Sequence, residues 1–178
     1  MMKRLVFTLI VLLLSADIVF PQKAVTTFLG IPVDGERSEI IQKLYMKGFR
    51  TSFNDKDILL GEWCGTDSEI HIVTHNDKVW RIMVCDARRM DEHAVKLRFN
   101  RLCRLFADNK AYLTDSIPVI PYKEDISYEM SVNHKRYEAY FRQKATQGEG
   151  GSVWFKISEW FGQYYIIAYY DNETNRYE

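Results

Sequence analysis

The four histidines are the side chains best suited to hold a metal ion or to move protons, and their spacing keeps them apart. His71 and His75 lie four residues apart in a segment with the period of a strand, so they share a face at a separation of about 13 Å. One ion cannot bridge that distance. His93 lies at the start of a predicted helix, and His134 lies in a predicted turn. The sequence therefore predicts no metal site.

Motifs that position a nucleophile, a phosphate or a dinucleotide are also missing from the sequence. The chain contains no H-E-x-x-H, G-x-S-x-G, P-loop or G-x-G-x-x-G pattern. The glycine-rich run at 148–151 has no predicted helix after it, so it does not form a phosphate cradle. We expect no catalytic residue and no cofactor, although residues far apart in a sequence can still converge in the fold.

Three cysteines, Cys64, Cys85 and Cys103, leave two interpretations open. All three have apolar neighbours, which favours three small core side chains. In an oxidising compartment one pair could instead form a disulfide and leave one thiol over, and the sequence does not say which pair. The chain has no C-x-x-C, and so it has neither a redox motif nor a zinc knuckle.

Several charged residues are expected to have structural roles. Asp86 and Asp171 each end a predicted strand, where we expect the carboxylate to cap the next segment, with cation binding as the alternative. Four basic residues form a stripe on a predicted helix: Lys96, Arg98, Arg101 and Arg104. We interpret this stripe as a solvated helix face, and contact with an acidic partner is the alternative.

The first 22 residues have the pattern of a secretory signal peptide. Lys3 and Arg4 precede an apolar run at 5–14, which is about half the length that a transmembrane helix needs. A basic start, a short apolar stretch and a polar exit are typical of a cleaved leader. We expect cleavage between Phe20 and Ala24. The alternative is an uncleaved N-terminal anchor, because apolar residues continue as far as Phe20.

The composition excludes some classes of function. Lys and Arg together number 24, and so do Asp and Glu, so no net charge favours nucleic acid or an anionic membrane surface. Residues 23–178 have the length of one ordinary domain, and nothing in them is apolar for long enough to span a membrane. We expect a secreted or periplasmic protein in which these residues form a single domain, with no nucleic-acid partner and no integral membrane segment after signal cleavage.

Helical and strand-like periods alternate along the chain in two blocks. In the first block the sequence predicts a helix at 38–47, capped by Ser38 and ended by Gly48, and then strands at 49–53, 58–64, 69–75 and 78–86. In the second block it predicts a helix capped by Asp91, a long loop at 108–125, and strands at 126–132, 136–142, 152–160 and 164–170. The last strand is a candidate sheet edge.

These blocks predict an α+β fold made of two tandem repeats, at about 28–87 and 91–172, each a helix followed by an antiparallel meander. Residues 72–86 align without a gap with 157–171, and three pairs are identical: Ile72/Ile157, Ile82/Ile167 and Asp86/Asp171. We expect the helices to pack on one face of a largely antiparallel sheet.

The chain also carries a family resemblance. It rests on four segments: Phe28-Leu-Gly-Ile-Pro-Val-Asp-Gly35, Ile40-Ile-Gln-Lys-Leu44, Gly48-Phe49 and Val79-Trp-Arg-Ile-Met-Val84. They are similar to a group of small secreted proteins of gut Bacteroidetes. The duplicated order of helix and meander resembles the beta-lactamase-inhibitor-protein-like fold, which also occurs in periplasmic proteins with PepSY-like domains. The resemblance implies a concave sheet face that can dock a protein, but it brings no known activity and transfers no inhibitory residue.

The uncovered face of that sheet is the candidate binding site. Alignment of the last strand with Trp80, Ile82 and Val84 assigns Tyr165, Ile167 and Tyr169 to the helix-covered core, and the alternate residues to the open face. A face rich in Trp, Tyr and Arg has the composition of a recognition surface. We expect eight side chains to bind: Trp154, Tyr164, Tyr170, Trp160, Tyr140, Arg142, Arg136 and Arg81. The alternatives are that aromatic pairs only stabilise the sheet, or that both faces are buried.

The sequence thus predicts a secreted or periplasmic, non-enzymatic protein that recognises a protein or peptide of the cell envelope through an aromatic-rich sheet face. Two alternatives belong to other classes of protein. One is an envelope small-ligand carrier or enzyme with a pocket between the two repeats. The other is an immunity-type inhibitor of a secreted toxin.

Overall fold

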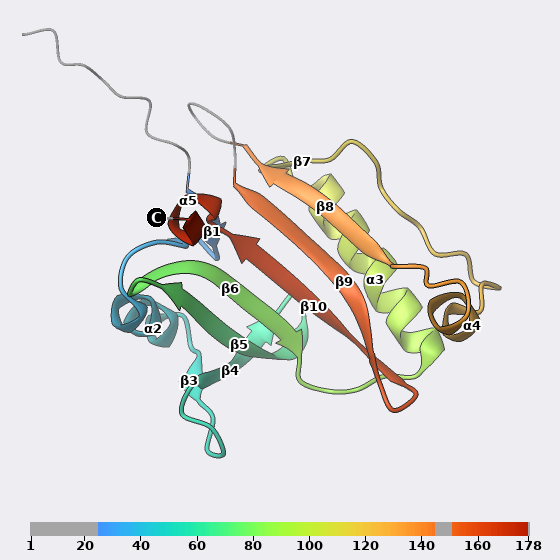
Figure 1. The fold of residues 1–178 in the computed structure, drawn as a ribbon, viewed down its shortest axis with the longest axis horizontal. Helices are drawn as coiled ribbons and strands as arrows, with labels where there is room; N and C mark the ends of the chain where they lie inside the picture. The colour runs from blue at the N-terminus through green and yellow to red at the C-terminus, as the bar shows by residue number, and fades with distance from the viewer. Residues whose placement is uncertain (1–24, 145–150, 178) are drawn as a thin grey trace, which may run out of the picture.

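The computed structural model describes residues 25–144 and 151–177, and in this part of the chain it has four helices and an eight-stranded sheet (Figure 1). The predicted signal peptide at 1–22 and most of the glycine-rich run at 148–151 lie outside the described residues. The elements in chain order are β1 Thr27–Phe28, β2 Ile31–Pro32, α2 Arg37–Met46, β3 Arg50–Thr51, β4 Ile58–Trp63, β5 Thr66–His75, β6 Lys78–Asp86, α3 Glu92–Asp108, β7 Tyr112–Leu113, α4 Ile126–Ser131, β8 Glu138–Gln143, β9 Ser152–Trp160, β10 Gln163–Asp171 and α5 Glu173–Tyr177.

The large sheet has the strand order β3-β4-β5-β6-β10-β9-β8-β7, and every pairing in it is antiparallel. The pairing of β10 with β6 joins the two halves of the chain at the middle of the sheet. The prediction that the last strand is an edge is therefore wrong, because β10 is hydrogen-bonded on both sides. The edges are β3 and β7, each only two residues long, and such short edges offer little backbone to another strand.

The first helix ends as predicted but begins differently. Gly48 has a positive φ of 91°, and its N–H donates to the Tyr45 carbonyl while the N–H of Phe49 donates to Leu44. These two bonds form the Schellman motif that glycine favours at a helix end. The N-cap, however, is Glu36, and no side chain caps this end. The prediction that Ser38 caps the helix is therefore wrong.

Helix α3 begins at the predicted cap, since Asp91 Oδ1 accepts from the Ala94 N–H at 2.7 Å. Its apolar side packs on β9 and β10, and the Phe99 ring lies edge-on to Phe155 at 5.5 Å. The basic stripe is only partly solvated. Lys96 and Arg98 are buried, at 8% and 7% exposed, because both have partners that are described below. The prediction of a solvated helix face is therefore wrong for Lys96 and Arg98.

The segment that was predicted as a strand at 126–132 is the short helix α4. Asp125 caps it by accepting from the Tyr128 N–H at 2.8 Å, and Ile126 is fully buried. A run this short has too few turns to show a helical period, so its apolar residues also fit a strand. The predicted hairpin around 133–135 is therefore absent, and β8 pairs with β9 and β7 instead.

One irregular position decides which residues of the central strands face the core. Val73 pairs with Arg81 and Thr74 pairs with Val79, so Trp80 is an extra residue opposite β5. Such a β-bulge shifts the alternation of the strand by one. Val79 is therefore buried, whereas Trp80 is only partly buried.

The register between β10 and β6 inverts the predicted faces of β10. Ala168 lies opposite Val84 and Tyr170 lies opposite Ile82, and side chains opposite one another share a face. The core residues of β10 are consequently its even-numbered ones: Tyr164, Ile166, Ala168 and Tyr170, at 4%, 0%, 0% and 3% exposed. The assignment of Tyr165, Ile167 and Tyr169 to the helix-covered face is wrong, because an offset of one residue exchanges the two faces of a strand. Tyr169 is nonetheless buried, at 8% exposed, on the opposite face.

The core is one cluster of apolar side chains from both halves of the chain, including Phe28, Leu59, Phe99 and Phe155. Cys64, Cys85 and Cys103 are free thiols. Cys103 is fully buried, and burial raises its pKa to about 12. Of the helices that the structure describes, none is long and apolar enough to cross a bilayer.

Candidate recognition surface

Three aromatic rings form a stack across β8, β9 and β10 on the sheet face that α3 does not cover. In Figure 1, α3 lies behind β8 and β9, so this face is turned toward the viewer. Strand register places Tyr140 opposite Trp154, and Trp154 opposite Tyr169. The rings of Tyr140 and Trp154 are 5.7 Å apart at an angle of 14°, and those of Trp154 and Tyr169 are 4.1 Å apart at 17°. We call these three residues the aromatic stack.

An arginine–aspartate pair fixes one side of the aromatic stack. The Arg81 guanidinium donates to both carboxylate oxygens of Asp171, at 2.6 and 2.8 Å. Trp154 Nε1 donates to the same carboxylate at 3.0 Å. The guanidinium also lies 4.6 Å from the centre of the Tyr169 ring. Bidentate pairing and contact with a ring are geometries that arginine favours, so the central indole is held in one orientation.

The edge of the surface is held by further polar contacts. The Tyr140 hydroxyl donates to Glu138 Oε2 at 2.5 Å, and this hydrogen bond to the carboxylate raises the pKa of Tyr140 to about 12. Burial raises the pKa of Tyr169 above its ordinary value. Both hydroxyls are therefore neutral near pH 7. Lys156, which lies opposite Glu138 on the neighbouring strand, adds a partly exposed cation.

The structure brings four of the predicted residues together in this region: Arg81, Tyr140, Arg142 and Trp154. Tyr140 is 57% exposed and is the outermost ring of the stack. Arg142 lies two residues further along β8 and is exposed, with Asp115 at 3.6 Å. Arg136 is exposed just before β8 begins.

Three predicted residues lie elsewhere. Trp160 is 59% exposed and packs on Phe161 at the β9–β10 turn, about 20 Å along the strand from Trp154. Tyr164 and Tyr170 are in the core, so their assignment to the binding face is wrong. The Tyr170 hydroxyl accepts from Trp63 Nε1 at 3.1 Å, deep in the protein.

Sequence reasoning missed that Tyr169 lies on the open face, where it is buried beneath its neighbours, and that Asp171 holds Trp154 and Arg81 there. Both faces of β10 carry large apolar side chains, so alternation alone could not separate them. The available signal was a pair of opposite charges, Arg81 within one apolar strand and Asp171 at the end of another; residues of this kind that lie opposite each other share a face.

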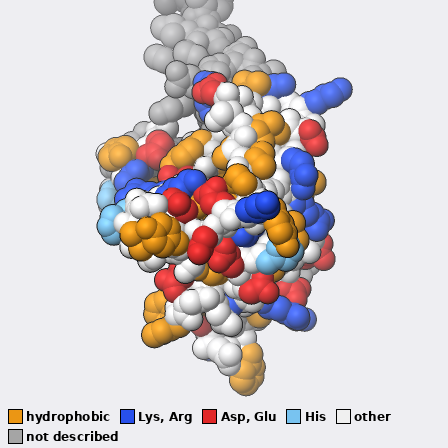
Figure 2. Space-filling model, turned by 90° about the vertical axis from the view of Figure 1, so that its right-hand side faces the viewer, with side chains coloured by type: hydrophobic (Ala, Val, Ile, Leu, Met, Phe, Trp, Pro, Cys, Tyr) orange, Lys and Arg blue, Asp and Glu red, His pale blue; other side chains and the backbone are white. Residues whose placement is uncertain are grey.

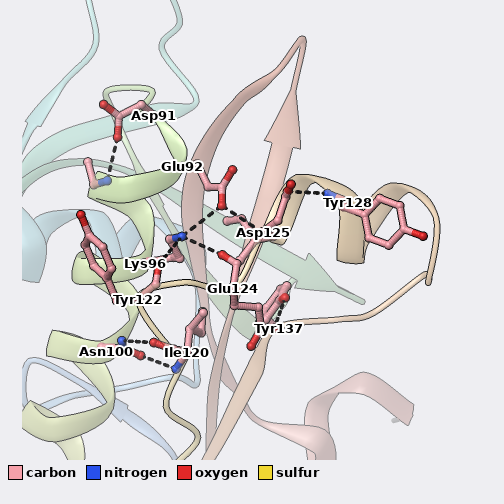
Figure 3. Close-up of polar contacts among 12 residues, drawn as sticks. Asp91, Glu92, Lys96, Asn100, Ile120, Tyr122, Glu124, Asp125, Tyr128 and Tyr137 are labelled. Carbon is pink, nitrogen blue, oxygen red and sulfur yellow. Dashed lines mark hydrogen bonds and ion pairs between the residues drawn. The ribbon is translucent and has the colours of Figure 1, made fainter.

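A second polar cluster, drawn in Figure 3, holds the long loop after β7 against α3. Lys96 Nζ donates to Glu92 Oε1 at 3.0 Å and to the carbonyls of Tyr122 and Glu124 at 3.1 and 2.7 Å. Asn100 exchanges two hydrogen bonds of 2.9 Å with the backbone of Ile120. All three donors of the ammonium group are used. The cluster is therefore a structural clamp, with no free group for chemistry.

The Glu124 carboxylate extends this clamp toward β8. It accepts hydrogen bonds from Lys135 and from the Tyr137 hydroxyl. Hydrogen bonds from Lys135 and Tyr137 hold its pKa below the ordinary value.

Figure 2 shows the side of the molecule turned 90° from Figure 1, where acidic, basic and hydrophobic side chains are interspersed. We see no extended apolar patch on that side comparable to the aromatic stack.

A buried arginine–aspartate pair lies on the core side of the sheet. Arg98 Nη2 is 3.1 Å from Asp86 Oδ1, and Asp86 Oδ2 accepts from the Ile166 N–H at 3.2 Å. Arg98 also donates to the carbonyls of Cys64 and Trp63. Burial raises the pKa of Asp86, and Arg98 partly offsets that effect. These contacts join α3, β4, β6 and β10, which is a structural role.

Among residues 25–144 and 151–177, no three His, Cys, Asp or Glu side chains form a group that could hold a metal ion. Comparison with known proteins gives no family: the chain has no significant match among protein-family models, curated proteins or solved structures.

Proposed function

We propose that the chain binds another protein or a peptide through the open sheet face centred on the aromatic stack. The observation that carries the proposal is the fixed orientation of Trp154 between two parallel rings, with its indole N–H bonded to Asp171. Rigid aromatic side chains with adjacent arginines are the residues that contribute most to protein recognition. Because the stack is already ordered, little conformational entropy is lost when a partner binds.

The charges around the stack indicate what the partner presents. Arg136, Arg142 and Lys156 lie on the same face, and Glu138 is the acidic residue between them. We propose a partner segment with an apolar side chain that packs on Tyr140 and Trp154, and carboxylates that meet the surrounding cations. A segment of this composition would bind less tightly as salt is raised, because exposed charge pairs are screened.

We also infer that the fold is a duplication with its helices on one face of the sheet. Support comes from the element order, since α2 is followed by β3–β6 and α3 by β7–β10, and from the sheet order, in which the two sets meet at β6 and β10. The proposed export to the periplasm or the exterior still rests on the N-terminal pattern, and the kinship with small secreted proteins of the beta-lactamase-inhibitor-protein-like fold rests on the segments given above.

The proposal is tested with a displayed random-peptide library selected on the wild-type chain. We expect enriched peptides that combine apolar residues with Asp or Glu. Their affinity should fall at least tenfold for Tyr140→Ala and for Arg142→Ala, because both side chains are exposed on the open face.

Tyr128→Ala is the matched control, since Tyr128 is 53% exposed on α4 and outside the open face. Equal binding of the enriched peptides by wild type, Tyr140→Ala and Arg142→Ala would overturn the proposal.

A further inference from the structure

A cavity of about 800 Å³ opens at the C-terminal end of α3, and residues from both halves of the chain line it. The first half contributes the β1–β2 turn and the end of β4, with Trp63. The second half contributes Leu105 and Phe106 of α3, Tyr112 of β7 and Tyr170 of β10. This volume lies within the usual range for pockets that hold small molecules.

The floor of the cavity is aromatic and ordered. Trp63 and Tyr170 are 2% and 3% exposed, and the Trp63 indole donates to the Tyr170 hydroxyl. Phe106 lies 6.3 Å from Trp63 and 4.7 Å from Tyr112, measured between ring centres. Gln143 donates to the Tyr112 hydroxyl at 3.2 Å. The polar atoms of the floor are thus paired within the protein, and its rings are largely buried. An entering group meets the exposed apolar side chains of the lining, Leu29 and Leu105, each 43% exposed.

The charge on the lining has one sign. Arg101 and Lys144 are the charged residues among the described lining, which contains no Asp or Glu. Both are exposed at the surface, where a long side chain can pack its stem on apolar groups and keep its charged end in water. The guanidinium of Arg101 lies beside Gly65, 3.2 Å from where a β-carbon would be.

We propose that this cavity binds a small amphipathic anion, with its apolar body against Leu29 and Leu105 and its carboxylate near Arg101 and Lys144. The cavity goes beyond the proposed recognition of a protein, because none of its lining belongs to the aromatic stack. Apolar walls supply the affinity, and a few placed charges select the anion.

The test uses one fluorescent probe and two competitors that differ in charge. Anilinonaphthalene sulfonate, an aromatic anion, is titrated into the full chain, and dodecanoate or dodecanol is then added to displace it. We expect saturable fluorescence, displacement by dodecanoate, and at least tenfold weaker displacement by dodecanol. Equal displacement by the neutral alcohol would overturn the assignment of an anion, and absence of saturable binding would overturn the site.

Variants locate the binding. Arg101→Glu reverses the charge at the mouth, and Leu105→Trp fills the cavity, so each should weaken dodecanoate binding at least tenfold. Arg104→Glu is the matched control on an exposed position of α3 that does not line the cavity, and we expect a change of less than twofold. Equal loss in Arg101→Glu and Arg104→Glu would contradict the proposal.

Two further measurements separate this site from the open sheet face. Tyr140→Ala should leave dodecanoate binding unchanged even where it abolishes peptide binding, so either proposal can fail without the other. Cys64 lines the cavity, whereas Cys103 is fully buried. Bound dodecanoate should therefore slow alkylation of Cys64, as located by mass spectrometry, and unchanged alkylation at saturation would place the ligand elsewhere.

Discussion

Two arginine–aspartate pairs lie at the ends of β6 and β10, on opposite faces of the sheet. Asp86 ends β6 and Asp171 ends β10, yet Asp86 faces the core with Arg98 from α3, while Asp171 faces the open side with Arg81 from the neighbouring strand. In the core pair the side chains of Arg98 and Asp86 are 6% and 0% exposed. In the other pair Asp171 is also buried, at 3%, and it is Arg81, at 20% exposed, that reaches solvent. The Arg98–Asp86 pair thus holds α3 against the sheet, and the Arg81–Asp171 pair orients Trp154 on the open face.

The difference follows from the phase of the strands. Ile82, Val84 and Asp86 alternate onto the core face, whereas Tyr169 and Asp171 alternate onto the open face. Each carboxylate therefore pairs with an arginine on its own face of the sheet, Asp86 with Arg98 and Asp171 with Arg81. This comparison teaches that two residues that align in the sequence need not have one role, because a shift of one residue changes which side chains they contact.

The largest expected effect is the loss of the buried arginine. Arg98→Ala leaves the Asp86 carboxylate buried without its cation, which costs about 3–5 kcal/mol of unfolding free energy. Urea denaturation followed by circular dichroism measures this loss. Arg104→Ala, an exposed neighbour on α3, should change stability by less than about 0.5 kcal/mol. If Arg98→Ala also lowers the free energy of unfolding by less than about 0.5 kcal/mol, the buried pair does not have the structural role given to it.

A smaller effect is expected for the pair on the open side. Asp171→Ala removes the acceptor of Arg81 and of Trp154 but leaves Arg81 able to reach water, so we expect a loss of about 2 kcal/mol. The same variant should weaken peptide binding, since the Trp154 ring loses its anchor. If Asp171→Ala destabilises the protein as much as Arg98→Ala, the two pairs do not differ in the way described.

The outer ring of the stack should matter for binding and little for folding. Tyr140 is 57% exposed, so Tyr140→Ala should reduce the unfolding free energy by no more than about 1 kcal/mol. Calorimetry of the variant with a selected peptide should show at least a tenfold loss of affinity. A large loss of stability would assign Tyr140 to the framework of the sheet.

The smallest effect concerns Glu124, whose carboxylate is partly exposed. Hydrogen bonds from Lys135 and Tyr137 lower its pKa in the folded protein. The ionised carboxylate therefore adds to the free energy of unfolding above the ordinary glutamate pKa of about 4.3. It is lost as the pH falls through the lower folded value. We expect this stabilisation to be less than about 1 kcal/mol. Glu124→Gln should remove this part of the pH dependence of unfolding in acid. An unchanged acid profile in Glu124→Gln would contradict the role of the carboxylate.

Much of the fold could be predicted from local signals. The antiparallel α+β class, the helix cap at Asp91 and the glycine end of α2 all depend on residues close in sequence. The inverted face of β10 could not be predicted, because it depends on pairing with β6, which is far away in the chain. For the same reason Trp154 and Tyr140 were found on the open face while Tyr164 and Tyr170 were misplaced there.

The most direct test of the recognition surface compares the two faces of the sheet. Tyr170→Phe keeps a buried ring and removes only its hydroxyl, so it should leave the affinity for a selected peptide unchanged within twofold. Tyr140→Ala, on the open face, should lower that affinity at least tenfold. Unchanged affinity in Tyr140→Ala together with a tenfold loss in Tyr170→Phe would contradict the account.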